Sequence, residues 1–82
     1  MAPKLRRLSG AAVVRILHSF GFLVVNIRGS HAKLRRTTTG GDTQILTVPL
    51  HKQLAPGTLH AVYRQAARFV PEDLLRSQFF SA

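Results

Sequence analysis

An alternating stretch that follows a glycine turn most constrains the fold of this chain. From residue 31 onward, two sets of side chains alternate: His31, Lys33 and Arg35 against Ala32, Leu34 and Arg36. Side chains of a strand point to opposite faces at every second residue, so a histidine and two cations share one face while the other face can enter a core. Two adjacent glycines and an aspartate within residues 38–42 then indicate a hairpin. The stretch therefore predicts a strand over residues 31–37 in an antiparallel sheet.

The segment before this stretch predicts a helix and another strand. Ser9 is a suitable N-cap, apolar side chains recur at helical spacing over residues 10–20, and Gly21 is placed as the C′ residue. Residues 22–27 form a short apolar run that is rich in β-branched residues and bounded by glycines, which is typical of a strand. Both faces of this strand are apolar, so the pattern does not indicate which of them packs inward.

The segment after the hairpin predicts a third strand and two helices. Residues 44–48 are strand-like, and Pro49 ends them. Pro56 opens a helix with one apolar stripe, and Pro71 ends that helix and starts a short last one. The predicted order is α-β-β-β-α with an extra short C-terminal helix. This is a small two-layer α+β domain whose helices pack on one face of the sheet and leave the other face open.

The chain length sets the number of domains. With 82 residues there is room for one small domain. Residues 1–8 carry Lys4, Arg6 and Arg7 and are predicted to be a loose basic N-terminal arm. Residues 9–82 are predicted to form the single domain.

The charge balance points to polyanionic partners. The chain has 12 Lys and Arg residues against 3 Asp and Glu residues, which gives a net charge of +9. A field of this sign attracts polyanions, and the planar fork of arginine suits phosphate oxygens. Nucleic acid is therefore the first candidate partner, and an acidic protein is the second.

Cysteine and hydropathy limit the compartment. The chain has no cysteine, which excludes disulfides and thiolate metal sites. No apolar run approaches the roughly 20 residues that span a bilayer, and Arg15 interrupts the stretch that could serve as a signal-peptide core. We therefore expect a cytoplasmic protein with no membrane partner. An arginine-bearing N-terminus without acidic residues also fits an organelle transit peptide, which is the alternative.

Among the four histidines, His31 is the candidate for chemistry. His18 and His60 lie on the polar faces of the predicted helices, where a plain surface role is expected. His31 shares its strand face with Lys33 and Arg35, and histidine can give or take a proton near neutral pH. An exposed strand histidine without a catalytic role is the alternative interpretation.

The remaining side chains narrow the reaction class. His31, His51 and His60 match no zinc spacing, and three scattered carboxylates are too few for a two-metal nuclease. We therefore expect neither a metal nor another cofactor. Transfer within RNA remains, in which the 2′-hydroxyl of the substrate attacks the adjacent phosphate and the protein supplies a proton-transfer group and cations. Arg28, Lys33 and Arg35 are the candidates to hold phosphates on either side of the cut, or else they only solvate an open sheet face.

At the level of motifs, the chain resembles the HicA family, the mRNA-cleaving toxins of bacterial toxin–antitoxin pairs, from Ser9 to about Leu75. Five segments carry the resemblance, in this order: Gly21-Phe22, Gly29-Ser30-His31, Val48-Pro49-Leu50-His51, Pro56-Gly57-Thr58-Leu59 and Gln65-Ala66. Their ordered series in a chain of this length is what makes the resemblance specific.

The resemblance implies a fold like that of double-stranded-RNA-binding domains and an endoribonuclease that acts on mRNA. It also implies that His31 is the catalytic residue, that Gly29 and Ser30 shape its turn, and that a HicB-type antitoxin covers this site. His51 lies in a matching segment, but the resemblance assigns it no catalytic duty. A structural or substrate-orienting role is therefore expected for His51.

The chain departs from the family pattern at three places. Ala32 stands where many members have a second histidine or another polar residue, and Leu34 stands where an aromatic residue is usual. The first departure removes a potential helper, and the second is a conservative core change. Phe69-Val70 replaces the small residue and cap that often precede the last helix, which leaves the path of the C-terminus open.

Two other functions compete with a toxin nuclease. A non-catalytic double-stranded-RNA-binding module would use the helix cations Arg15, Arg64 and Arg68 rather than His31. An interaction protein would use its basic surface only to dock an acidic partner. The aromatic pair Phe79 and Phe80 is interpreted as a packed corner, or alternatively as a contact for the antitoxin.

Overall fold

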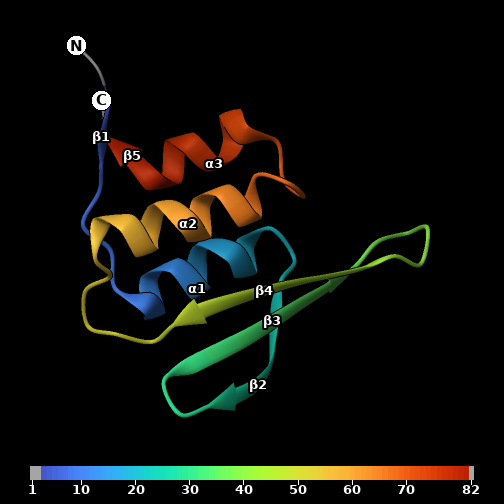
Figure 1. Ribbon diagram of the computed structural model, residues 1–82. Helices are drawn as coiled ribbons and strands as arrows, with labels where there is room; N and C mark the ends of the chain where they lie inside the picture. Colours follow the sequence, from blue (N-terminus) through green and yellow to red (C-terminus); the bar gives the residue numbers. More distant parts are fainter. Residues whose placement is uncertain (1–2, 82) are drawn as a thin grey trace.

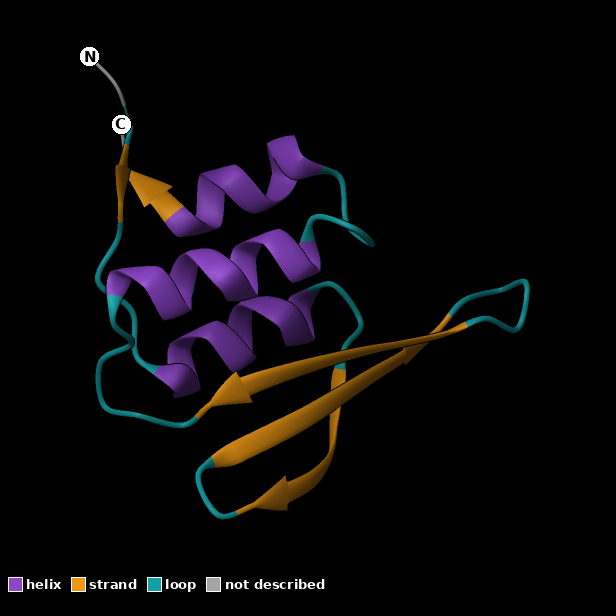
Figure 2. Cartoon of the chain, viewed as in Figure 1, coloured by secondary structure: helices purple, strands orange, loops and turns teal. Residues whose placement is uncertain are grey.

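Helices form one layer of the molecule and an antiparallel sheet forms the other (Figures 1 and 2). The computed structural model describes residues 3–81. In chain order the elements are β1 (Lys4–Leu5), α1 (Gly10–Ser19), β2 (Leu23–Arg28), β3 (His31–Thr37), β4 (Thr43–Pro49), α2 (Pro56–Ala66), α3 (Glu72–Phe79) and β5 (Phe80–Ser81). The predicted α+β class and the α-β-β-β-α order are confirmed. No helix within residues 3–81 has the length and apolar character needed to cross a membrane.

The main sheet has the strand order β2-β3-β4, with β3 at its centre. Both neighbours are antiparallel to β3: His31 lies opposite Arg28 on β2 and opposite Pro49 on β4. The predicted bounds of the central strand, residues 31–37, agree with the structure. Ala32 and Leu34 are completely buried beneath the helices, as the alternation predicts.

Helix α1 begins and ends where the sequence predicts. The Ser9 hydroxyl accepts a hydrogen bond of 3.0 Å from the Ala12 amide, which satisfies one of the free amides at the helix start. At the other end, the Gly21 amide donates to the His18 carbonyl and the Phe22 amide donates to the Leu17 carbonyl. This is the Schellman arrangement, and Gly21 adopts the φ of +94° that it requires.

The strand before the turn differs from its prediction. The sequence predicts residues 22–27, whereas β2 runs from Leu23 to Arg28 and all six of its residues are exposed. Phe22, which precedes it, is fully buried. Neither face of β2 therefore packs against the core, because the helix layer covers β3 and β4 but leaves β2 uncovered.

The prediction of a loose arm over residues 1–8 is wrong for residues 4–8, which are ordered in the structure. Lys4 and Leu5 pair with Ser81 and Phe80 to form the small sheet β1-β5. The Arg6 amide donates to the Phe79 carbonyl, the Arg6 guanidinium donates to the Gln78 carbonyl at 2.8 Å, and Leu8 is buried. The order arises because this segment packs against the C-terminal helix. Residues 1, 2 and 82 lie outside the described part of the chain.

Phe79 and Phe80 form the predicted packed corner. Phe79 is fully buried and Phe80 is partly buried. Their rings meet the Tyr63 ring edge-on, with centroid distances of 5.4 and 5.2 Å. This corner attaches α3 to α2, and it leaves no exposed aromatic pair for a partner to bind.

Arg36 joins the two layers. Its Nε donates to the Gln44 side chain at 2.8 Å, and its two terminal nitrogens donate to the carbonyls of Phe20 at 3.0 Å and Phe69 at 2.8 Å. The guanidinium carbon lies 4.7 Å from the centre of the Phe22 ring, within the range of a cation–π contact. The turn after α2, where the chain departs from the family pattern, is therefore tied to β3.

Candidate functional site

The open face of the sheet gathers the cationic side chains that the sequence predicts for it. His31, Lys33 and Arg35 are exposed, whereas the residues between them point to the helix layer. Arg28 lies directly opposite His31, and directly opposite residues of an antiparallel pair share a face, with Cβ atoms about 5 Å apart. The structure thus brings Arg28, His31, Lys33 and Arg35 together. This set is called the basic face below.

The turn before His31 depends on glycine. Gly29 has a φ of +59°, in the left-handed region that side chains with a Cβ rarely adopt. A Cβ at this position would meet no atom within 4 Å, so the requirement is conformational rather than a matter of space. Gly29 and Ser30 therefore shape the turn that places His31 at the start of β3.

A second segment is held beside this turn. The Leu50 amide donates a hydrogen bond to the Ser30 carbonyl, and the Gly10 amide donates to the His51 carbonyl at 2.9 Å. A Cβ on Gly10 would overlap the Pro49 carbonyl, so only glycine lets α1 approach this connector. The arrangement brings residues 49–51 next to residues 29–31. His51 is exposed there, while His18 and His60 lie on α1 and α2.

Polar residues on the neighbouring strands complete the basic face. Lys33 lies between Asn26 on β2 and Thr47 on β4. Sequence reasoning missed both, because their positions depend on the pairing registers of the strands, and the β2-β3 pairing that brings Asn26 beside Lys33 includes a shift between Val24 and Asn26. Their amide and hydroxyl groups can donate hydrogen bonds to phosphate or sugar oxygens.

The basic face carries positive charges that no carboxylate of the described residues neutralises. Within residues 3–81 the only ion pair joins Arg76 to Glu72, at 3.3 Å, and both residues belong to α3. The other two carboxylates are Asp42, in the hairpin, and Asp73, on α3. Arg28, Lys33 and Arg35 therefore have no carboxylate partner in the described part of the chain and remain available to an anion.

The groups with shifted pKa values lie away from the basic face. Burial raises the pKa of Tyr63, and the hydrogen bond from its hydroxyl to Glu72, at 2.8 Å, raises it further. The same hydrogen bond, together with one from Arg76, lowers the pKa of Glu72. This cluster holds α3 against α2 and has a structural role.

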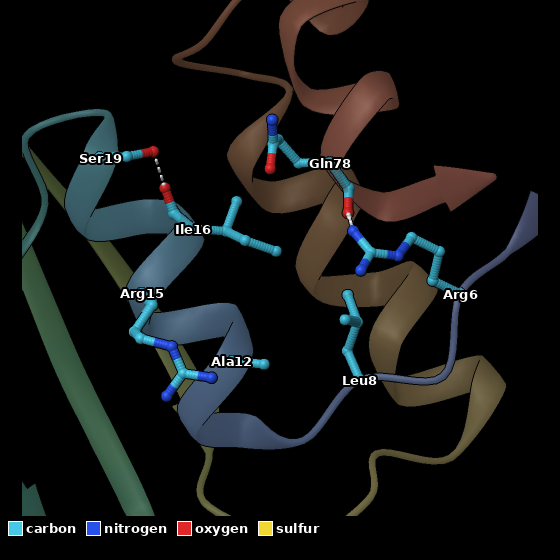
Figure 3. A pocket seen from close by; sticks show the side chains of 7 residues that line it. All are labelled: Arg6, Leu8, Ala12, Arg15, Ile16, Ser19 and Gln78. Carbon is cyan, nitrogen blue, oxygen red and sulfur yellow. Dashed lines mark hydrogen bonds between the residues drawn. The ribbon is translucent and has the colours of Figure 1, made fainter.

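A hollow of about 340 Å³ lies between α1, the N-terminal segment and α3 (Figure 3). Arg6 and Arg15 reach it from different elements, and Leu8, Ala12 and Ile16 line it with apolar groups. Arg6 is already bonded to the Gln78 carbonyl, and the Ser19 hydroxyl donates to the Ile16 carbonyl. None of the residues predicted for the nuclease site lines this hollow, and its polar groups do not converge on one point.

The described histidines and carboxylates do not converge. Within residues 3–81 there is no group of three or more such side chains placed to hold a metal ion. On the basic face, an imidazole can transfer a proton and the nearby cations can stabilise negative charge.

Comparison with known families identifies the chain. The family model described as the HicA toxin of bacterial toxin–antitoxin systems matches residues 10–67, which is well over half of the chain and includes the whole basic face. A comparison with curated proteins gave no match. The chain belongs to the HicA family and is, as a member, the toxin of a toxin–antitoxin system, with an antitoxin as its partner.

Proposed function

We propose that this toxin is an endoribonuclease that binds mRNA on the basic face and cleaves it with His31 as the proton-transfer residue. One observation carries the proposal: an exposed histidine stands on a sheet face with three cations that have no carboxylate partner in the described chain. Membership of the HicA family supports the same function. We place the activity in the cytoplasm, where mRNA is translated.

The proposed reaction is transfer within the RNA backbone. The neutral His31 imidazole accepts the proton of a 2′-hydroxyl, whose oxygen attacks the adjacent phosphorus. The new bond between the 2′-oxygen and phosphorus forms as the bond from phosphorus to the 5′-oxygen breaks. Water donates a proton to the leaving oxygen, and the hydroxide that remains takes the proton back from the His31 imidazolium. The products are a 2′,3′-cyclic phosphate and a 5′-hydroxyl end. The step needs no metal and no other cofactor.

The other residues of the site have supporting roles in this proposal. Arg28, Lys33 and Arg35 bind phosphates around the cut and stabilise the additional negative charge of the transition state. Gly29 and Ser30 hold His31 in place through the shape of the turn. His51 orients substrate from the connector beside Ser30. A HicB-type antitoxin neutralises the toxin by covering the basic face.

Expression of the toxin without a partner tests the proposal in cells. Wild-type chain should arrest growth and deplete mRNA, whereas His31→Ala should do neither. His18→Ala is the matched control, since His18 is also an exposed histidine but lies on α1. Cleaved ends from wild type should carry the cyclic phosphate, and purified toxin should still cleave in the presence of a chelator. Equal RNA decay with wild type and His31→Ala would refute the catalytic assignment.

The competing RNA-binding module has one observation in its favour. Arg15 and Arg64 are exposed on α1 and α2, and Arg68 is exposed in the turn after α2, where a duplex could bind. If this function is correct, Arg64→Ala weakens binding to a duplex, His31→Ala leaves it unchanged, and no RNA is cleaved. The two functions therefore give opposite results with the same pair of variants.

A further inference from the structure

Strand β2 exposes aliphatic side chains to a degree that no other element matches. Six large hydrophobic residues are exposed within the described chain, and four of them are on β2: Leu23 at 54%, Val24 at 42%, Val25 at 43% and Ile27 at 55%. β2 is also an edge strand, with β3 on one side and no strand of residues 3–81 on the other (Figure 1). An exposed apolar edge with free backbone groups is a template for another strand.

Exposed aliphatic side chains lie on both faces of this edge. Val24 and Ile27 lie opposite the buried Leu34 and Ala32, so they face the helix side, yet the helices do not cover them. Leu23 lies opposite Arg35, on the side of the basic face. A strand added beside β2 would therefore cover aliphatic surface on both sides of the sheet.

The charges around β2 indicate which kind of partner could bind beside this strand. Arg28 ends the strand, and Lys33 and Arg35 lie opposite Asn26 and Leu23. None of the residues of β2, β3 and β4 is acidic. A second copy of this chain would bring like charges together, at a net charge of +9 for each copy. RNA bases stack on aromatic rings, and β2 has none.

We propose that β2 docks an extended acidic segment of the antitoxin, which adds to the sheet as a fourth strand. Its backbone would pair with the free edge, its aliphatic side chains would cover those of β2, and its carboxylates would meet Arg28, Lys33 and Arg35. The proposal rests on the proposed neutralisation by an antitoxin and specifies how that antitoxin attaches.

A strand of the antitoxin that pairs with β2 would attach the antitoxin to the toxin without itself covering His31. Adjacent strands lie about 4.8 Å apart, so an added strand would lie on the order of 10 Å from β3. It would stand beside His31 without filling its surroundings. Substitutions of the exposed aliphatic residues of β2, such as Ile27→Asp, should therefore weaken partner affinity while the free toxin still cleaves RNA.

A peptide titration of the full chain tests this docking mode. The probe is a blocked eight-residue peptide of alternating valine and glutamate, and its counterpart has lysine in place of glutamate. Amide NMR should show chemical-shift changes and slowed hydrogen exchange over Leu23–Arg28 with the glutamate peptide, and affinity should fall as salt is added. Ile27→Asp should weaken binding at least tenfold. Leu74→Asp, a change at another exposed apolar residue on α3, should leave it unchanged.

Three outcomes would overturn the proposal. Equal binding of the lysine peptide would remove the charge argument. Chemical-shift changes confined to other elements, or no binding at all, would remove β2 as the site. A dimer of the toxin alone that Ile27→Asp abolishes would make a second copy the occupant. RNA cleavage by the free toxin is measured separately, so loss of the proposed nuclease function and loss of this docking site give different results.

Discussion

The two faces of β3 carry similar residues and use them in opposite ways. Arg35 and Arg36 are neighbours in the chain, but Arg35 is exposed on the basic face and Arg36 is half-buried with three hydrogen-bond partners. The guanidinium of Arg36 binds carbonyls beyond the ends of α1 and α2, where the helix dipoles favour a cation. The comparison shows that position within the sheet, rather than residue type, decides which cation stabilises the fold and which is available to a substrate.

The cations of the basic face also lack the hydrogen-bond partners within the described chain that Arg36 has on the covered face. Every partner of Arg36 is a neutral acceptor within the chain, whereas Arg28, Lys33 and Arg35 have no carboxylate partner in the described residues. Like charges on adjacent strands repel each other, so this face is less stable alone than it would be with an anion bound. A surface of this kind is consistent with phosphate binding.

The largest effect on the covered side is expected from Gly10→Ala. The added Cβ would overlap backbone atoms of Pro49 and Leu50, so α1 or the connector must move. We expect the free energy of unfolding to fall by about 3 kcal/mol or more in urea denaturation. Gly57→Ala is the control, because its Cβ meets nothing within 4 Å; there the change should be within about 0.5 kcal/mol. Similar stabilities for the two variants would contradict the close approach of α1.

Substitution of the neighbouring arginines tests the comparison directly. Arg36→Met keeps much of the side-chain stem but removes hydrogen bonds to Gln44, Phe20 and Phe69, and it should lower the free energy of unfolding by about 2–3 kcal/mol. Arg35→Met should change it by less than about 0.5 kcal/mol. Urea denaturation of both variants is the measurement. Equal losses would mean that the two faces of β3 do not differ in the way described.

RNA affinity should depend on the exposed cations of the basic face and not on the helix layer. Lys33→Ala and Arg35→Ala should each weaken binding of single-stranded RNA severalfold and reduce the slope of log affinity against log salt by about 0.7. Arg64→Ala, on the polar side of α2, should have little effect. Fluorescence anisotropy at several salt concentrations measures both quantities. A larger loss for Arg64→Ala would move the binding surface to the helices.

The smallest effect is expected at Glu72, far from β3. Its pKa is lowered by the Tyr63 hydrogen bond and by Arg76, so the bonded carboxylate stabilises the fold above its ordinary pKa of 4.5 and loses this contribution as pH falls below it. The raised pKa of Tyr63 acts in the other direction, and its contribution is lost as pH rises above 10.0. Glu72→Gln should flatten the acid side of a stability profile measured by thermal unfolding. An unchanged acid side would show that this cluster does not contribute.

Local patterns predicted much of the fold. The bounds of β3, the Ser9 cap and the Gly21 terminus each depend on residues within a few positions, so the sequence alone indicates them. The β1-β5 pair joins residues from opposite ends of the chain, and two-residue strands carry no pattern of their own. The role of Arg36 was also hidden, because its acceptors come from three segments that only the folded chain brings together.

The sequence likewise predicts only part of the candidate site. Alternation along β3 was sufficient to place His31, Lys33 and Arg35 on one exposed face. The hydrogen bond from Leu50 to Ser30, which brings the His51 segment beside the turn, depends on the path of the connector. The exposure of β2 could not be predicted either, since it depends on how far the helix layer extends across the sheet.

Single-turnover cleavage of RNA by purified His31→Ala, with its stability and RNA affinity measured alongside, tests the central claim most directly. A general acid or base contributes about 10²- to 10⁴-fold to a rate, so the cleavage rate should fall by that factor. Stability and RNA affinity should stay close to wild type, and His18→Ala should cleave normally. A His31→Ala rate equal to wild type, or a loss explained by unfolding, would contradict the assignment of His31 as the proton-transfer residue.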